Sequence, residues 1–167
     1  MDAPAPVRRP LSSLLSLLLH VGGSLLAGVL GGLATRSSVG SWYQTLDKPS
    51  WNPPSWVFGP VWSTLYVLMG IAAWGVWRAA APAEAKRRAA LLFWGQLVLN
   101  TLWSFLFFGL RSPGLALIEV LVLWAAILLT LRAFWRLRPL SGALLCPYLA
   151  WVSYAAALTA AIAWLNR

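Results

Sequence analysis

Apolar residues run along this chain in five long stretches, which short polar or proline-rich segments separate. A helix needs about 20 mainly apolar residues to cross a hydrocarbon core about 30 Å thick. Five stretches meet that length, and we predict one transmembrane helix for each: residues 11–34, 55–77, 89–110, 113–135 and 141–165. The pattern therefore predicts the fold class, an all-α integral membrane protein built as a five-transmembrane-helix bundle.

The length of the chain, 167 residues, fits a single domain. We place one membrane domain at residues 11–167, after an N-terminal tail of residues 1–10 whose Pro/Ala-rich sequence predicts disorder. The link Ala80–Ala85 between the second and third helices is also predicted to be disordered. The first stretch follows Arg8 and Arg9, as a secretory signal does, but it exceeds the apolar region of about 7–15 residues in such a signal. We therefore interpret it as the first helix.

The first two helices are joined by an aromatic, proline-rich loop, residues 35–54. Each proline lacks an N–H donor and favours extended geometry in the residue before it, so no regular helix is expected before Pro54. Pro60 is acceptable only near a helix start, so the second helix begins between Ser55 and Pro60. The loop and this helix start hold four tryptophans and four prolines: Trp42, Trp51, Trp56, Trp62, Pro49, Pro53, Pro54 and Pro60. The loop is a candidate lid, although Trp42 and Trp56 also fit a belt of tryptophans at the membrane interface.

Composition supports the membrane interpretation. Hydrophobic residues make up 60% of the chain, charged residues 10%, and the mean hydropathy is +0.72, whereas soluble domains carry about 25% charged residues. The single cysteine, Cys146, excludes an intrachain disulfide framework and a multi-cysteine metal site. The formal charge is +9, but the basic residues lie between apolar stretches and no RNA- or DNA-binding motif accompanies them. We expect no nucleic acid partner and interpret the charge as a signal of orientation in the lipid bilayer.

The basic residues divide unequally between the two ends of a five-helix bundle. An odd number of spans puts the termini on opposite sides, and the side with more Lys and Arg is the cytoplasmic one. One side collects nine: Arg8, Arg9, Arg78, Lys86, Arg87, Arg88, Arg132, Arg136 and Arg138. The other side has four: Arg36, Lys48, Arg111 and Arg167. We predict a multi-pass protein with its N-terminus inside and with the 35–54 loop and the C-terminus outside.

Small, polar and aromatic residues within the helices follow helical spacing. Gly23, Ala27 and Gly31 recur every fourth residue and allow two backbones to approach closely, inside the bundle rather than in a dimer. Three other helices carry aromatic and polar stripes: Trp62 and Tyr66 in the second, Gln96, Asn100 and Trp103 in the third, and Tyr148, Trp151, Ala155 and Leu158 in the fifth. If these stripes converge, they enclose an apolar cavity with a few fixed polar groups, as in small-molecule sites. The alternative is ordinary aromatic packing.

Two ionisable residues fall within the predicted helices. Glu119 lies about 9 Å along the fourth helix, where a charge is costly and is often functional or paired, and we favour contact with the interface or a helix partner. His20, the only histidine, fits hydrogen-bonded packing better than haem ligation, because no second ligand accompanies it. No Ser/His/Asp arrangement, Gly-rich phosphate loop or pair of membrane acids is present. The residues alone therefore indicate no catalytic centre, and we expect no metal and no cofactor.

Several motifs resemble one known family more specifically than the physical pattern does. They are Trp42-Tyr43, Lys48-Pro49-Ser50-Trp51-Asn52-Pro53-Pro54, Trp56, Gly59-Pro60-Val61-Trp62, Tyr66, Gly95-Gln96-Leu97 with Asn100, Phe107-Phe108-Gly109 and Pro147-Tyr148-Leu149-Ala150-Trp151. Together they resemble the tryptophan-rich sensory protein and translocator protein family, formerly the peripheral benzodiazepine receptors. The match runs from the first helix to the fifth, and residues before about His20 match poorly.

The resemblance implies a pocket beneath the loop between the first two helices of a bundle that is commonly dimeric. Family members bind porphyrins and other tetrapyrroles, and animal members bind cholesterol and synthetic ligands of the benzodiazepine and isoquinoline carboxamide types. Matched residue by residue, the resemblance places the pocket at Trp51, Trp62, Tyr66, Gln96, Asn100, Trp103, Trp151, Ala155 and Leu158. The animal cholesterol pattern has a tyrosine shortly before a Lys or Arg, whereas Thr159 and Ala160 follow Leu158 here, so a tetrapyrrole is favoured over a sterol. We expect a homodimer, in a bacterial cell membrane rather than a mitochondrial outer membrane.

Three classes of function fit the resemblance. The leading hypothesis is a membrane receptor or translocator that binds tetrapyrroles, such as porphyrins or haem precursors, in an intramembrane pocket. The first alternative is an enzyme that degrades porphyrin in a light- and oxygen-dependent reaction, with Trp62 and Trp151 as candidate catalytic residues. The second alternative is a regulatory or structural membrane partner with an incidental cavity.

Overall fold

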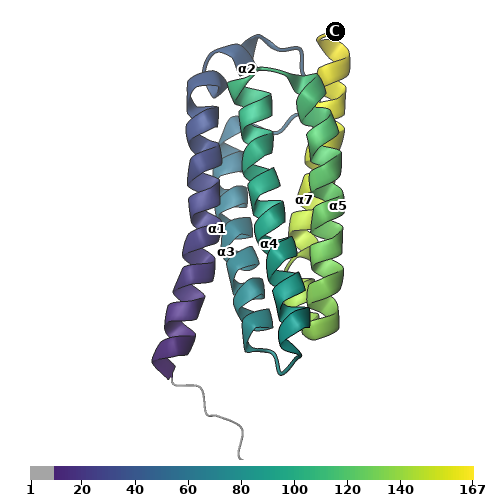
Figure 1. The fold of residues 1–167 in the computed structure, drawn as a ribbon. Helices are drawn as coiled ribbons and strands as arrows, with labels where there is room; N and C mark the ends of the chain where they lie inside the picture. The colour runs from purple at the N-terminus through teal and green to yellow at the C-terminus, as the bar shows by residue number, and fades with distance from the viewer. Residues whose placement is uncertain (1–9) are drawn as a thin grey trace, which may run out of the picture.

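The computed structural model describes residues 10–167, with side chains from Ser13 onward except that of Ser37. Five spans of this part of the chain are long and apolar enough to cross a membrane, which confirms the predicted fold class (Figure 1). The first four are α1 (Pro10–Val39), α3 (Ser55–Arg78), α4 (Ala83–Ser104) and α5 (Pro113–Leu137), and the fifth joins the short α6 (Pro139–Ala143) to α7 (Cys146–Leu165). The predicted N-terminal tail lies outside the described residues, apart from Pro10, which begins α1.

The spans form a bundle in which α1 packs against α3 and α4, α4 against α5, and α5 against α7 (Figure 1). Contacts between α3 and α7 are sparse, so the bundle closes only loosely there. Large side chains in the core are almost completely buried: Met69, Phe93, Leu123, Ile127 and Phe134. The loose closure leaves α1, α3, α4 and α7 around a space that no α5 side chain lines.

Prolines mark the beginnings of several helices. Pro54 and Pro82 immediately precede α3 and α4, and Pro113 and Pro139 are the first residues of α5 and α6. A proline at these positions removes no intrahelical hydrogen bond, because the first N–H groups of a helix have no acceptor within it. The start of α3 at Ser55 confirms the interval predicted from the proline-rich loop.

Close approaches between helices depend on glycine. A Cβ at Gly23 would lie 2.6 Å from a tryptophan ring of α4, and one at Gly31 would lie 3.0 Å from Oγ of Ser104 in α4. This face of α1 therefore packs inside the bundle, as predicted. On another face of α1, a Cβ at Gly70 of α3 would lie 2.5 Å from the Cα of Val21. A clash with backbone atoms cannot be relieved by rotating a side chain. The close contact between α1 and α3 at this point therefore requires glycine at position 70.

The helix ends differ from the predicted ones where charged residues occur. α4 begins at Ala83 rather than at residue 89, so the predicted disordered link Ala80–Ala85 is wrong over its second half. Glu84 pairs with Arg87 at 3.1 Å and with Arg88 at 3.0 Å on the helix surface. Ion pairs spaced three and four residues apart stabilise a helical turn. These two pairs stabilise the first turns of α4, which precede the apolar stretch.

The loop predicted at residues 35–54 is shorter than expected. α1 continues to Val39 rather than ending at residue 34, and α2 (Trp42–Thr45) forms a short helix before the first proline. The end of the predicted third helix is a π-helical segment, η1 (Phe105–Gly109). The hydroxyl of Ser38 donates to the carbonyl of Phe108 at 2.7 Å, which ties η1 to the end of α1.

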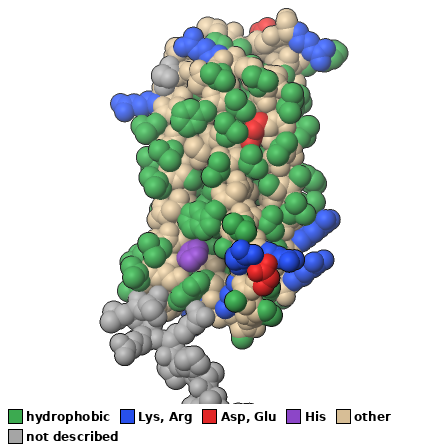
Figure 2. All heavy atoms as spheres, viewed as in Figure 1, with side chains coloured by type: hydrophobic (Ala, Val, Ile, Leu, Met, Phe, Trp, Pro, Cys, Tyr) green, Lys and Arg blue, Asp and Glu red, His purple; other side chains and the backbone are tan. Residues whose placement is uncertain are grey.

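Charged side chains gather at the two ends of the bundle, and mainly apolar ones cover the wall between them in the view of Figure 2. We call the end that carries residues 40–54 and the C-terminus the loop end, and the other end the α6 end (Figure 1). Leu18, Leu26 and Leu33, all within the apolar span of α1, are each about three-fifths exposed, at 60%, 58% and 61%. Such an apolar surface suits contact with lipid, and a helix exposes few unpaired backbone groups there because it bonds them internally.

Candidate ligand-binding site

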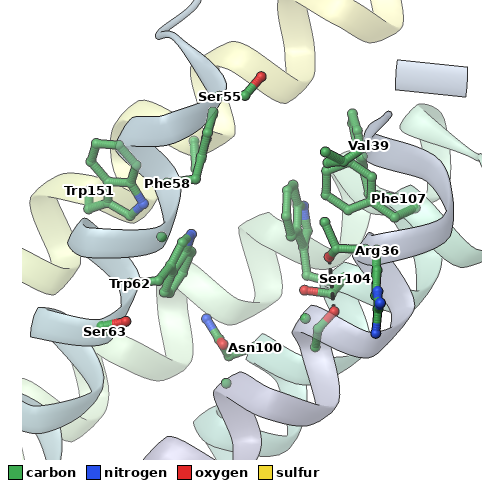
Figure 3. A pocket seen from close by; sticks show the side chains of 18 of the residues that line it. Arg36, Val39, Ser55, Phe58, Trp62, Ser63, Asn100, Ser104, Phe107 and Trp151 are labelled. Atoms are coloured by element: carbon green, nitrogen blue, oxygen red, sulfur yellow. Dashed lines mark hydrogen bonds between the residues drawn. The ribbon is translucent and has the colours of Figure 1, made fainter. Parts of the chain in front are cut away.

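A cavity of about 650 Å³ lies in the half of the bundle nearest the loop end. α1 and α3 form two facing walls, and α4, η1 and α7 complete it. Figure 3 shows Trp62 and Trp151 on one side, with Ser104, Phe107 and Arg36 across from them. Among the described residues that line the cavity, Arg36 alone is charged. The arrangement is that of a mainly apolar small-molecule site with few polar groups.

The cavity is open to the surface between α1 and α3. Leu25, Val29 and Arg36 of α1 line it and are exposed, as is Ser63 of α3. The opening therefore lies along the apolar spans rather than within the loop.

Aromatic rings form most of the wall from α3 and α7. Trp62 stacks on Tyr66 with ring centroids 5.5 Å apart, and Phe58 meets Trp151 edge to face at 6.0 Å. Trp62 also meets the ring of Tyr148 edge to face at 6.2 Å. Such pairs fix the ring planes, because edge-to-face and offset-stacked contacts are favoured over other geometries. The cavity thus presents flat, apolar surfaces in set orientations.

A chain of hydrogen bonds joins α3, α4 and α7 next to these rings. The hydroxyl of Tyr66 donates to Oδ1 of Asn100, the Asn100 amide donates to the Tyr148 hydroxyl at 3.2 Å, and Tyr148 donates to Oε1 of Gln96 at 2.8 Å. All four side chains are buried. Because an unpaired buried polar group is costly, this network fixes the three helices relative to one another. The prediction that the two carboxamides avoid lipid is confirmed, and the condition that the three stripes converge is met at these side chains.

Seven of the nine residues that the resemblance assigned to a pocket line the cavity: Trp62, Tyr66, Asn100, Trp103, Trp151, Ala155 and Leu158. Gln96 is not among the lining residues, because its side chain is 1% exposed and is turned to Tyr148. Trp51 is not among them either, and its ring meets that of Tyr154 edge to face at 5.6 Å. Whether any of the nine binds a ligand stays a prediction.

The sequence did not predict that α1 and η1 form one wall of the cavity. Its members include Gly28, Gly32, Arg36, Phe107 and Phe108. Gly28 and Gly32 are one helical turn apart and adjacent to the predicted Ala27–Gly31 face, so glycine spacing was a usable signal. For Arg36 the sequence offers no such signal, because a cation at this position also fits the membrane interface.

Polar contacts stiffen the loop between α1 and α3. The ammonium group of Lys48 donates to the carbonyls of Tyr43 and Leu46 at 2.8 and 2.7 Å. The hydroxyl of Tyr43 donates to Oδ1 of Asn52 at 2.8 Å. Burial raises the pKa of the Tyr43 hydroxyl. The loop therefore has a fixed internal shape.

The same loop is tied to α7. Tyr154 donates to the carbonyl of Trp51 at 2.8 Å, and Asn166 exchanges two hydrogen bonds with the backbone of Asp47, at 3.0 and 2.9 Å. Of the two tryptophans for which an interface belt was the alternative, Trp56 is 75% exposed. Trp42 instead packs edge to face on a ring of η1. The loop covers the loop end as a tethered segment.

The ionisable residues inside the helices contribute no metal site. Among residues 10–167, no group of three or more His, Cys, Asp and Glu side chains is placed to hold a metal ion. Nδ1 of His20 bonds to the carbonyl of Ser16 at 2.7 Å within α1, which is a packing arrangement. Glu119 is 7% exposed, and neither of its carboxylate oxygens has a hydrogen-bond partner in the part of the chain that the structure describes. Of the two contacts expected for Glu119, with the interface or with a helix partner, a hydrogen bond to a helix partner is therefore not found there.

Five helices long and apolar enough to span a membrane, packed around a mainly apolar and aromatic cavity, define a multi-pass membrane protein. The chain belongs to the TspO/MBR family, whose model matches residues 20–165. The resemblance inferred from the sequence motifs is thereby confirmed, including the poor match before about His20.

The match to three named relatives covers most of the length of each. The chain is 41% identical to Tryptophan-rich protein TspO of Chlorobaculum tepidum over 153 residues, which are 92% of this chain and 97% of that protein. It is 44% identical to the Translocator protein of Homo sapiens over 118 residues, 70% of each chain. Protein CrtK of Rhodobacter capsulatus is 42% identical over 130 residues, 77% of this chain and 81% of that protein. Family membership supports a membrane receptor or translocator role.

Proposed function

We propose that this protein is a membrane receptor or translocator whose cavity binds a tetrapyrrole. The observation that supports it best is that three tryptophans, Trp62, Trp103 and Trp151, line one cavity together with the amide of Asn100. Flat aromatic walls suit a flat, conjugated ring system, and each aromatic contact contributes about 0.5–1.5 kcal/mol beyond area burial. The volume of about 650 Å³ lies within the range of about 300–1,000 Å³ usual for small-molecule pockets.

The lining residues favour a metal-free porphyrin over haem. None of them is His, Cys or Met, the residues that most often ligate haem iron. The two tyrosines that line the cavity, Tyr43 and Tyr66, both donate their hydroxyls to asparagine side chains. A porphyrin would therefore be held by ring contacts and peripheral polar groups rather than through a central metal.

The test is to fill the cavity from α7. Ala155 lines the cavity, whereas Ala157 on the same helix is exposed and does not line it. Ala155→Phe should weaken saturable quenching of tryptophan fluorescence by protoporphyrin IX at least about tenfold, because the added ring occupies ligand space. Ala157→Phe, the matched control, should bind as the wild type does. Equal affinities in all three proteins would place the ligand elsewhere, and non-saturable quenching in the wild type would refute tetrapyrrole binding.

A second candidate function is light-driven degradation of the bound porphyrin. It is favoured by the position of two indoles, Trp62 and Trp151, in the wall of the same cavity. In such a reaction the porphyrin would be oxidised and dioxygen reduced, with an electron-rich indole as the candidate redox-active group of the chain. Phenylalanine keeps much of the ring contact but not this chemistry, so binding and turnover can be separated.

The experiment compares Trp62→Phe and Trp151→Phe with the wild type under illumination in air. If an indole takes part, both variants should still quench on porphyrin binding, with only modest loss of affinity, while loss of porphyrin absorbance slows severalfold or more. Dark samples serve as the control. Equal rates of bleaching in wild type and variants would remove the indole chemistry and leave the binding function in place.

A further inference from the structure

Arg36 is charged, yet it lines a mainly apolar cavity. It stands in the last turn of α1, close to the loop end, and its side chain is exposed at the edge of the cavity (Figure 3). Among the described residues it has no ion-pair partner, since both ion pairs found there join Glu84 to arginines at the α6 end. No hydrogen bond to another described side chain or carbonyl engages it either. The guanidinium group is therefore available to an anion that enters the cavity.

Two other donors of the cavity also lack an acceptor. The indole N–H groups of Trp103 and Trp151 are buried and find no partner in the described part of the chain. Oδ1 of Asn100 already accepts from Tyr66, and the hydroxyl of Thr35 donates to a carbonyl of its own helix at 2.9 Å. Four further hydroxyl groups line the cavity and can either donate or accept: those of Ser55, Ser63, Ser104 and Thr159. The arginine and the two indoles can only donate, so the lining groups that lack a partner and cannot accept are all donors. A complementary ligand supplies acceptors and negative charge.

We propose that Arg36 is the specificity-determining residue of the cavity and that the ligand is an anionic amphiphile with carboxylate groups. Its acid groups bind the guanidinium at the loop end, and its apolar body lies against Trp62 and Trp151. This proposal rests on the proposed function. It adds the chemical class of the ligand and the orientation of the ligand in the cavity. An arginine fork binds a carboxylate through two parallel hydrogen bonds, and the apolar walls strengthen the attraction by lowering the local dielectric. Near the end of a span, the charge itself is tolerated.

The test compares a diacid with its neutral diester, protoporphyrin IX and its dimethyl ester, in a non-ionic detergent. Wild-type protein should bind the diacid about tenfold more tightly than the diester, as expected of a charge-assisted bond at a partly exposed site. Arg36→Gln should lose that preference without weakening diester binding. Arg36→Lys should keep part of it, because a lysine retains the charge but not the planar fork. The matched control is Arg167→Gln, which removes an exposed arginine of the loop end that does not line the cavity.

Salt gives a second readout. Added salt should weaken diacid binding to the wild type and have little effect on Arg36→Gln, because screening acts on the charge pair. Retention of the wild-type diacid preference and salt dependence in Arg36→Gln would overturn the proposal and assign the guanidinium to lipid headgroups. If the wild type binds the diester saturably but shows no preference for the diacid, tetrapyrrole binding stands and the role of Arg36 fails. If neither porphyrin binds, the proposed function itself fails.

Discussion

At the scale of single residues, the two buried amides of α4 have different positions. Asn100 lines the cavity and accepts a hydrogen bond from Tyr66, whereas Gln96 stands one turn away and reaches only the supporting network. Both bond to the hydroxyl of Tyr148. Asn100 is therefore both a part of the cavity wall and a structural group, and Gln96 is structural alone.

The structural role of Asn100 can be tested by measuring the stability of variants at this position. Asn100→Leu leaves the buried hydroxyl of Tyr66 without its acceptor and should lower the free energy of unfolding by about 1–2 kcal/mol. Adding Tyr66→Phe should recover part of that loss, because removing both partners of a buried bond is closer to neutral. Thermal unfolding in detergent, followed by circular dichroism, measures the difference. A double variant less stable than Asn100→Leu alone would contradict this assignment.

Ligand binding should separate the two amides. Asn100→Leu removes a polar anchor from the cavity wall and should weaken protoporphyrin IX binding several-fold. Gln96→Leu changes a side chain that does not line the cavity, so its effect on affinity should be smaller. Titration by fluorescence quenching at a temperature where both variants stay folded measures the two constants. A larger loss for Gln96→Leu would mean that the ligand reaches past Tyr148.

Helical periodicity predicted which residues share a face, but not how deep each lies. Gln96 and Asn100 are four residues apart on one stripe, and both were assigned to the pocket. Only the packed structure reveals that the ring of Tyr148 stands beside Gln96 and closes the space there. The position of Trp51 was equally out of reach, because it depends on a contact with Tyr154, 103 residues further along the chain.

At the scale of elements, the contact between α1 and α3 limits the cavity on the side away from the loop end. Near Gly70 the two backbones meet at Val21, whereas nearer the loop end the same helices separate and line the cavity. Gly70 thus allows the two backbones to approach closely at this point. The opening between them depends on that approach.

Gly70→Ala should therefore separate α1 from α3. Its Cβ would lie 2.5 Å from a backbone atom of Val21, and relieving such overpacking costs about 1–3 kcal/mol. Gly95→Ala in α4 is the control, since a Cβ at Gly95 meets nothing within 4 Å. Alanine there should be neutral or slightly stabilising, because it is the better helix former. A melting temperature for Gly70→Ala equal to that of the control would show that the helices do not touch at this point.

The elements were predictable to the extent that apolar length defines them. All five spans follow from that rule, because lipid requires about 20 apolar residues whatever the packing. The rule does not extend to the first turn of α4, where ion pairs of Glu84 rather than apolar residues stabilise the helix. Nor does it predict η1, whose carbonyl at Phe108 is satisfied by Ser38 of another helix. Features made by contacts between distant segments need the structure.

At the scale of the whole molecule, basic side chains are divided between the two ends of the bundle. The α6 end carries seven basic residues of the described chain: Arg78, Lys86, Arg87, Arg88, Arg132, Arg136 and Arg138. The loop end carries four: Arg36, Lys48, Arg111 and Arg167. The asymmetry therefore persists without Arg8 and Arg9, which lie outside the described residues. Orientation and the expected homodimer both stay predictions.

The charge asymmetry predicts that the α6 end is cytoplasmic and that the loop end, with the cavity beneath it, faces outward. Ser50 in the loop is exposed, and so is Ala83 at the α6 end. The native Cys146 is exposed as well, so both test cysteines belong in a Cys146→Ser background. In intact cells, Ser50→Cys should react with a membrane-impermeant maleimide, whereas Ala83→Cys should react only after the membrane is opened. The reverse pattern would place the loop end in the cytoplasm and would reverse the side from which the cavity is approached.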